Sequence, residues 1–187
     1  MSFVPLPPGW EDATPGVDPS VPPKVPVRAP AEAEWFVNAD VDWWTKVLYG
    51  PPGFDAYVRV QLVNDRGETR DEPAMAPVLE LLSSHTSGDV FVALWDGYGG
   101  DVPQGPRFEV PHRSYVLLER ALDAVLDDEW FNEPHLVWPA GHAWFIAADV
   151  DPVWFTVGCS TDVATALMGD PRILSELTEY GTRLEIE

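Results

Sequence analysis

The hydrophobic positions of the chain fall into short runs separated by proline, glycine and aspartate. The most apolar and aromatic run is Leu136 to Ser160, LVWPAGHAWFIAADVDPVWFTVGCS. Residues 144–150 and 153–159 are apolar at nearly every position, which is typical of strands covered on both faces. The sequence Asp-Val-Asp-Pro at residues 149–152 interrupts the pattern and favours a turn. The stretch therefore predicts a hairpin in the interior of a sheet.

Several other runs have the β-branched and aromatic composition of strands. Residues 54–63 read FDAYVRVQLV, and residues 89–95 read DVFVALW. Residues 107–110 and 114–119 form two strand pieces around a proline, and residues 136–138 form a short extended piece.

Helices are predicted where apolar residues recur at intervals of three and four. Pro73 opens a helix whose apolar face carries Met75, Val78, Leu79 and Leu82. Ser160 or Thr161 can cap another helix, which ends at Gly169. Asp42 can cap a short helix, and residues 121–126 form one more candidate.

Three segments are ambiguous: residues 34–38 are interpreted as a strand, residues 173–177 as a short helix and residues 182–186 as a last strand. The predicted fold class is α+β. It has a mainly antiparallel sheet of about five or six strands, with two or three short helices on one side.

The N-terminal segment, residues 1–33, is distinguished by its prolines. Nine lie between Pro5 and Pro30, a density that excludes a helix or a central strand. We expect this segment to be extended or disordered, followed by a single α+β domain over residues 34–187.

Composition limits the possible partners and the compartment. The chain of 187 residues has 11 Lys and Arg against 31 Asp and Glu, and a net charge of −20. Binding of nucleic acid or anionic lipid needs clustered basic side chains, so we expect neither nucleic acid nor a membrane as a partner. We expect no signal peptide and no membrane span, because the N-terminus lacks a basic region and no apolar run reaches about 18 residues. A cytoplasmic location is the expectation.

Two neighbouring groups supply the candidate ligand-binding residues. Trp95, Asp96 and Tyr98 follow a strand in a glycine-rich loop, which can form the floor of a pocket or simply a tight turn. Arg113 lies beside His112, Tyr115 and Arg107. It can bind a carboxylate or phosphate through two hydrogen bonds, or pair with one of the acidic residues.

Two further groups are candidates for metal binding and catalysis. Asp149 and Asp151 would share one face of a strand and could hold Mg²⁺ or Ca²⁺, although a turn explains the same residues. Cys159 with His142 or His112 would give a nucleophilic pair, but an apolar strand disfavours a reactive thiolate. As the single cysteine, it also excludes an intramolecular disulfide. No catalytic residue, metal site or cofactor is predicted.

The order of several short motifs is distinctive. The chain carries AYVRV at residues 56–60, LLSSHT at 81–86, LWDGYG at 94–99, P-x-R-x-Y at 111–115 and VGCS at 157–160. With residues 136–151, this order resembles a family of uncharacterised actinobacterial proteins over about residues 54–171. Many members look like P-R-x-Y followed by LWWP, A-D-R-x-W and VGG. Here residues 135–139 read HLVWP, His142 stands where a basic residue is usual, and Cys159 stands where glycine is common. The resemblance implies no activity and no catalytic residues.

The leading hypothesis for function is a non-enzymatic binding or interaction protein with an acidic surface. Such a protein would be of the immunity or regulatory kind and would engage a basic partner protein. The alternative is a small-molecule-binding protein or an enzyme with a pocket near Trp95, Asp96, Tyr98 and Arg113. A third hypothesis is a structural domain within an oligomer.

Overall fold

Eight strands form one sheet in the computed structural model, which describes residues 30–62, 75–97, 103–127 and 135–182. The strand order is β3-β4-β2-β5-β6-β7-β1-β8, and every neighbouring pair is antiparallel. The strands are β1 (Ala56–Gln61), β2 (Val90–Trp95), β3 (Arg107–Val110), β4 (Arg113–Arg120), β5 (Leu136–Pro139), β6 (Phe145–Ala147), β7 (Trp154–Cys159) and β8 (Ser175–Thr178). The prediction of a mainly antiparallel sheet is confirmed, but the predicted number of about five or six strands was too low.

The hairpin of residues 144–159 lies inside the sheet, as predicted. β6 pairs with β5 and β7, and β7 pairs with β6 and β1. Trp144, Phe145 and Ile146 are fully buried although their side chains alternate between the two faces. Both faces of the sheet are therefore covered at this point.

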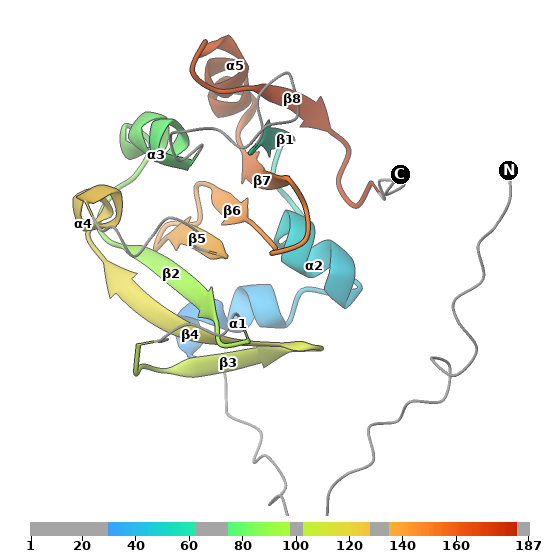
Figure 1. Cartoon of the computed structure of the whole chain (residues 1–187), viewed down its shortest axis with the longest axis vertical. Coiled ribbons are helices and arrows are strands. Elements are labelled where there is room, and N and C mark those ends of the chain that lie inside the picture. The colour runs from blue at the N-terminus through green and yellow to red at the C-terminus, as the bar shows by residue number, and fades with distance from the viewer. Residues whose placement is uncertain (1–29, 63–74, 98–102, 128–134, 183–187) are drawn as a thin grey trace, which may run out of the picture.

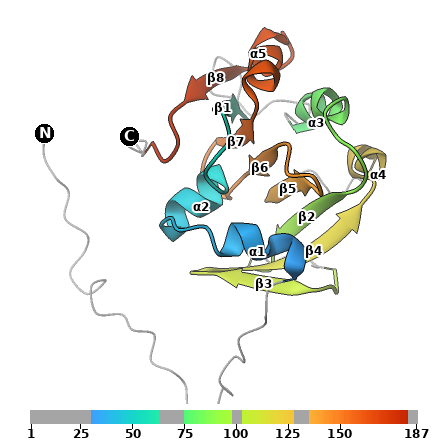
Figure 2. The same ribbon diagram turned by 180° about the vertical axis from the view of Figure 1, so that it is seen from behind.

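Five helices in the described part of the chain cover the two faces (Figures 1 and 2). α3 (Met75–Ser83), α4 (Leu122–Asp127) and α5 (Thr161–Gly169) pack on one face, and α1 (Ala31–Val37) and α2 (Trp43–Tyr49) pack on the other. The expectation of two or three helices on one side was wrong. The sheet carries large apolar side chains on both faces, and each face buries its own cluster.

The face under α3, α4 and α5 is mainly aliphatic. Val58, Val60 and Val157 of the sheet meet Leu79, Leu82 and Leu167 of the helices there. Trp144 is the exception in size, and its indole Nε1 donates a hydrogen bond of 3.0 Å to the Thr86 hydroxyl just after α3. This bond satisfies the polar atom of a side chain that is fully buried.

The face under α1 and α2 is aromatic. Phe145 stacks between Trp138 and Phe36, with ring centroids 5.4 Å and 5.5 Å away. Phe108, Tyr115 and Tyr57 extend the same cluster along the sheet. Burial of these large rings is the main contribution of α1 and α2, whose seven residues each are too few to be stable alone.

Two assignments made from the sequence were wrong in type. Residues 34–38 were expected as a strand, but α1 begins at Ala31, before the expected domain boundary, because Ala33 and Phe36 are buried one helical turn apart. Residues 173–177 were expected as a helix, but Ser175–Thr178 forms β8 by pairing with β1. The caps behave as predicted: Asp42 accepts from the Thr45 amide at 3.1 Å, and Ser160 accepts from the Val163 amide at 3.3 Å.

Several predicted features lie outside the described residues: most of the proline-rich segment, Pro73, Tyr98 and nearly all of the expected strand over residues 182–186. Within the described ranges, no helix is long and apolar enough to cross a membrane.

Candidate functional site

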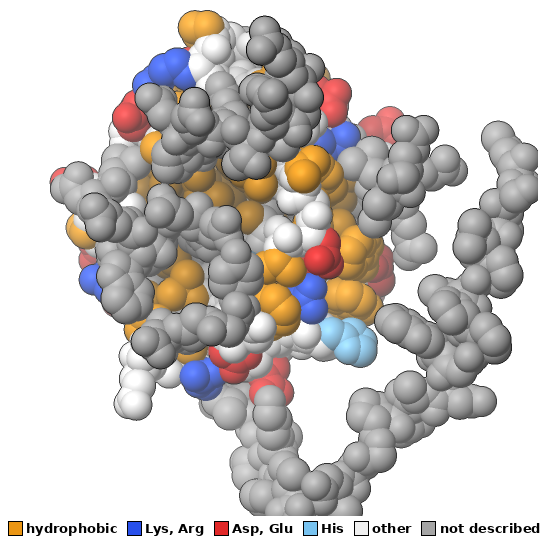
Figure 3. All heavy atoms as spheres, in the orientation of Figure 1, with side chains coloured by type: hydrophobic (Ala, Val, Ile, Leu, Met, Phe, Trp, Pro, Cys, Tyr) orange, Lys and Arg blue, Asp and Glu red, His pale blue; other side chains and the backbone are white. Residues whose placement is uncertain are grey.

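Two of the predicted site residues meet at one end of the sheet. Trp95 ends β2 and lies opposite Tyr115 of β4, and Arg113 begins β4 two residues earlier. Asp149 follows β6, and Trp43 begins α2. Arg113, Asp149, Trp43 and Trp95 are in contact and are called the Arg113 cluster below. Near the turn between β3 and β4, Figure 3 shows a basic side chain framed by hydrophobic side chains, with a histidine beside it.

The Arg113 guanidinium is held from several sides. Its Nη2 donates to both oxygens of Asp149 at 3.0 Å and 3.2 Å, and its Nε donates to Oδ1 at 3.3 Å. The guanidinium carbon lies 4.4 Å from the ring centre of Trp95 and 5.8 Å from that of Trp43. Its Nη1 donates to the His112 carbonyl at 3.2 Å. The cation is therefore paired, hydrogen-bonded and flanked by two aromatic rings.

Burial makes this ion pair different from a surface pair. The Asp149 side chain is 2% exposed and the Arg113 side chain is 12% exposed. Removal of either partner would leave a charge in a largely dry environment. The guanidinium donors that a phosphate or carboxylate ligand would use are already bonded to Asp149. Arg113 thus pairs with an acidic residue of the chain, which was the second of the two roles predicted for it.

Tyr115 lies beneath this pair and is fully covered. Burial raises the pKa of its hydroxyl far above the ordinary value of 10.0, and the nearby Asp149 carboxylate raises it further, whereas Arg113 acts in the opposite direction. The hydroxyl is therefore neutral at physiological pH and is not poised to act as a base.

The loop after β2 is shaped by the Trp95 ring. A Cβ atom at Gly97 would lie 2.4 Å from Cζ2 of Trp95, so glycine is required where the ring folds back over the backbone. The Trp95 amide donates to Nδ1 of the buried His135 at 3.2 Å, which anchors the end of β2 to the start of β5. This geometry supports the tight-turn interpretation for Asp96 and Gly97, and the rest of the glycine-rich loop lies outside the described residues.

Asp96 pairs with Arg107 and not with Arg113, so it is not part of the Arg113 cluster. Its Oδ2 accepts from Nη1 of Arg107 at 2.5 Å, and both side chains are partly exposed at 32% and 42%. Trp95 and Arg113 are thus in contact, Asp96 forms a separate surface pair, and Tyr98 lies outside the described residues.

The two aspartates considered for a cation are not arranged as a site. Asp149 is buried against Arg113, whereas Asp151 is exposed. In the ranges given above, no three or more His, Cys, Asp or Glu side chains lie close enough to hold a metal ion.

Cys159 and the two histidines considered with it belong to opposite sides of the sheet. Cys159 is fully buried in the aliphatic cluster, and its burial raises the pKa of the thiol to about 12. His142 stacks on Trp35 with ring centroids 3.9 Å apart, and His112 packs against Trp43, both on the aromatic side. A thiolate–imidazole pair is therefore not assembled.

A pocket lies elsewhere, between α5 and the strands β1 and β8. Its volume is about 380 Å³, and its lining includes Asp55, Ala164, Met168, Leu177 and Glu179. Trp95, Asp96 and Arg113 are not among its lining residues. Sequence reasoning missed this pocket because its walls come from segments far apart in the chain. The only signal was the apolar residue Leu177 within the otherwise polar sequence SELT.

Comparison with known proteins gives no relative: no family model, curated protein or solved structure matches the chain.

Proposed function

We propose that this protein is a non-enzymatic binding protein, of the immunity or regulatory kind, whose acidic surface engages a basic partner protein. The observation that carries this proposal is the state of five of the six basic side chains in the described part of the chain, the exposed Arg120 being the sixth. Arg59, Arg107, Arg113 and Arg172 each form an ion pair with a carboxylate of the same chain. Lys46 is buried, and its ammonium group donates to the Val37 carbonyl at 2.7 Å.

The excess of acidic over basic residues therefore appears at the surface as negative charge. Exposed carboxylates are spread over several elements and loops: Glu32, Asp40, Asp55, Asp89, Glu119, Asp123, Asp151, Asp162 and Glu179. A surface of this kind attracts a positively charged protein over several ångströms and repels nucleic acid and anionic membranes.

Binding to a basic protein can be tested with the intact chain as bait. Immobilised protein is incubated with lysate of the native host at low salt, and the bound proteins are identified and then purified for titration. We expect a partner with a basic patch whose affinity falls steeply between roughly 50 and 500 mM NaCl, because salt screens surface charges over a Debye length. A partner that binds equally well at both salt concentrations, or the recovery of acidic partners alone, would contradict the proposal.

The alternative function, binding of a small molecule near Trp95, Asp96, Tyr98 and Arg113, has one observation in its favour. Trp95 and Arg113 are in contact, and neither is completely buried. An anionic ligand there must displace Asp149 from Arg113. A thermal-shift screen with nucleotides and carboxylic acids separates the two functions, because a ligand at 100 times its Kd stabilises the fold by about 2.7 kcal/mol.

A further inference from the structure

We propose that the groove between α5 and the β1–β8 edge of the sheet is the docking site for the partner. The occupant is an extended segment of the partner that lies along β8, with apolar side chains at alternate positions in the groove and lysine or arginine at the end beside Asp55 and Glu179. This inference rests on the proposed function and specifies where the acidic surface acts.

The groove combines an apolar floor with an open mouth. Ala164 and Met168, one helical turn apart on α5, face Leu177 of β8 across a space of about 380 Å³. Four large hydrophobic side chains are exposed in the described part of the chain, and two of them line this groove: Leu177 at 58% and Met168 at 41%. Exposed apolar side chains that gather in one hollow are typical of an interaction site.

β8 also offers its backbone. It is the last strand of the sheet, and no other described strand pairs with its outer edge. Such an edge can accept an added strand from another protein, with main-chain hydrogen bonds for affinity and alternate side chains for specificity. In register with Val58, Leu177 lies on the side of the sheet that α5 covers, so every second side chain of an added strand would point into the groove.

Charge selects the kind of segment that can bind. Asp55 and Glu179 line the groove, and Asp162 is exposed in the first turn of α5 beside Thr161, which also lines it. The register of β1 with β7 and β8 brings Asp55, Glu179 and Asp162 to one end of the apolar floor, where β1 and α5 begin and β8 ends. A lysine or arginine at that end of the added strand would meet these carboxylates. A second copy of the chain is a poor occupant, because each copy has a net charge of −20.

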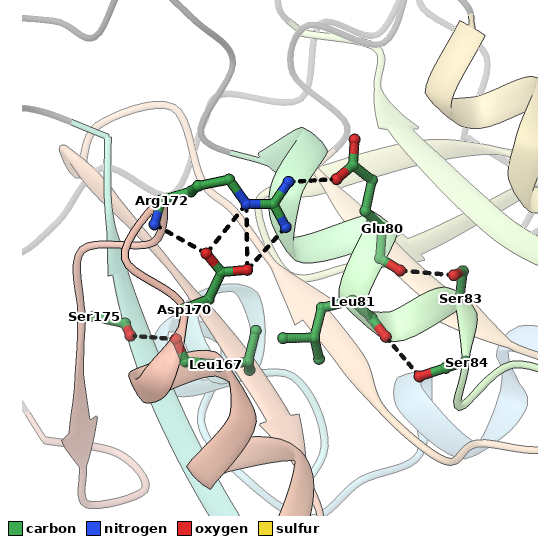
Figure 4. Close-up of polar contacts among 8 residues, drawn as sticks. All are labelled: Glu80, Leu81, Ser83, Ser84, Leu167, Asp170, Arg172 and Ser175. Atoms are coloured by element: carbon green, nitrogen blue, oxygen red, sulfur yellow. Dashed lines mark hydrogen bonds and ion pairs between the residues drawn. The ribbon is translucent and has the colours of Figure 1, made fainter.

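The connection that carries the chain from α5 to β8 is fixed in place, as Figure 4 shows. Arg172 donates to Asp170 through its backbone amide at 2.9 Å and through its guanidinium at 2.8 Å, and its Nη1 reaches Glu80 of α3 at 2.6 Å. The Ser175 hydroxyl donates to the Leu167 carbonyl at 3.4 Å. The groove is therefore preformed, and little ordering of its walls opposes binding.

The test uses isotope-labelled full-length protein and three eight-residue peptides, observed by NMR. The first peptide alternates valine with threonine and carries a lysine at each end, so that one lysine meets the carboxylates in either strand direction. The second peptide replaces valine with serine, and the third replaces lysine with glutamate. We expect the lysine–valine peptide to shift the amide and methyl signals of Ala164, Met168 and Leu177 in a salt-dependent way. The lysine–serine peptide should bind about tenfold more weakly, which corresponds to about 1.4 kcal/mol, and the glutamate–valine peptide should cause no shifts.

Matched variants separate the groove from the rest of the surface. Leu177→Ser should weaken the lysine–valine peptide about tenfold. Leu174→Ser is the control, because Leu174 is 39% exposed in the same segment but does not line the groove. Asp55→Asn with Glu179→Gln should weaken binding at low salt and have little effect at high salt, whereas Asp123→Asn with Asp151→Asn should have little effect at either.

The outcomes distinguish this inference from the function on which it rests. Salt-dependent shifts on another acidic face, or equal effects of Leu174→Ser and Leu177→Ser, overturn the groove and leave the acidic binding function standing. No salt-dependent shift with either lysine peptide contradicts both proposals. Groove shifts that appear with increasing protein concentration and no peptide, together with a doubled mass by light scattering, identify a second copy as the occupant and overturn the inference.

Discussion

Replacement of Asp149 by alanine should destabilise the protein more than replacement of any other carboxylate near the Arg113 cluster. The substitution removes the acceptor of three hydrogen bonds from Arg113 and leaves the guanidinium in place. With only 12% of its side chain exposed, Arg113 cannot recover full hydration.

The magnitude follows from the burial of the pair. Loss of one partner of a buried ion pair costs about 3–5 kcal/mol. The rings of Trp95 and Trp43 remain beside the guanidinium and offset part of this cost, since a cation over an aromatic face gains about 0.5–2 kcal/mol. We therefore expect the free energy of unfolding to fall by about 3 kcal/mol, and Tm to fall by about 6–12 °C for a chain of this size.

Urea-induced unfolding followed by far-UV circular dichroism measures the change, and urea adds no salt that would screen the ion pair. Asp96→Ala is the matched control: it breaks a pair between the same residue types, but Asp96 and Arg107 are 32% and 42% exposed. That loss should be at most about 1 kcal/mol. The double replacement Arg113→Met with Asp149→Leu should recover much of the stability, because two apolar side chains leave no charge without a partner.

Equal losses for Asp149→Ala and Asp96→Ala would refute the reasoning, since the difference in burial is its only basis. A double replacement that is less stable than Asp149→Ala would also refute it. Either result would show that the ion pair between Arg113 and Asp149 is not shielded from water.

Three further changes test other parts of the structure. Gly50→Ala should lower the free energy of unfolding in urea by more than about 2 kcal/mol, because Gly50 has φ of 74° and a Cβ there would lie 2.3 Å from the Phe145 ring. Gly53→Ala is the control and should cost less, because Gly53 has φ of 107° but open space around it. The thiol of Cys159 should not react with Ellman's reagent at pH 8 until denaturant is added. Folding raises the pKa of this thiol from 9.0 to about 12, so its contribution to stability should be intact below pH 9 and be lost between pH 9 and 12, where the unfolded thiol ionises first. Ser160→Ala should lower the free energy of unfolding by about 1 kcal/mol through loss of the cap of α5, and Ser160→Asn, tested by the same unfolding measurement, should restore most of it.

The strands that could be predicted from the sequence are those whose own side chains mark them. Residues 56–61, 90–95 and 154–159 are rich in branched and aromatic residues and lie in the sheet as expected. β8 could not be predicted in this way, because SELT becomes a strand only through the backbone partners that β1 provides. The sheet consequently has more strands than the sequence pattern indicates.

The site shows the same division between local and distant information. That Arg113 would pair with a carboxylate followed from the large excess of acidic residues. The sequence did not indicate that its partner would be Asp149, 36 residues away, or that Trp43 of α2 would flank it. Both contacts depend on the register of four strands and on the packing of a helix that lies far away in the sequence. The groove beside α5 depends on three separated segments and had no recognisable pattern.

The position of β1 between β7 and β8 has a consequence for biosynthesis. β1 is the first of the described strands, and its two neighbours in the sheet are residues 154–159 and 175–178. During translation, β1 lacks both of its strand neighbours, and α2 lacks its contacts with β6 and β7, until most of the polypeptide has been made. Aromatic side chains of these segments stay exposed in the meantime. A nascent chain stalled before residue 154 should therefore be a client of chaperones, whereas the released protein should not.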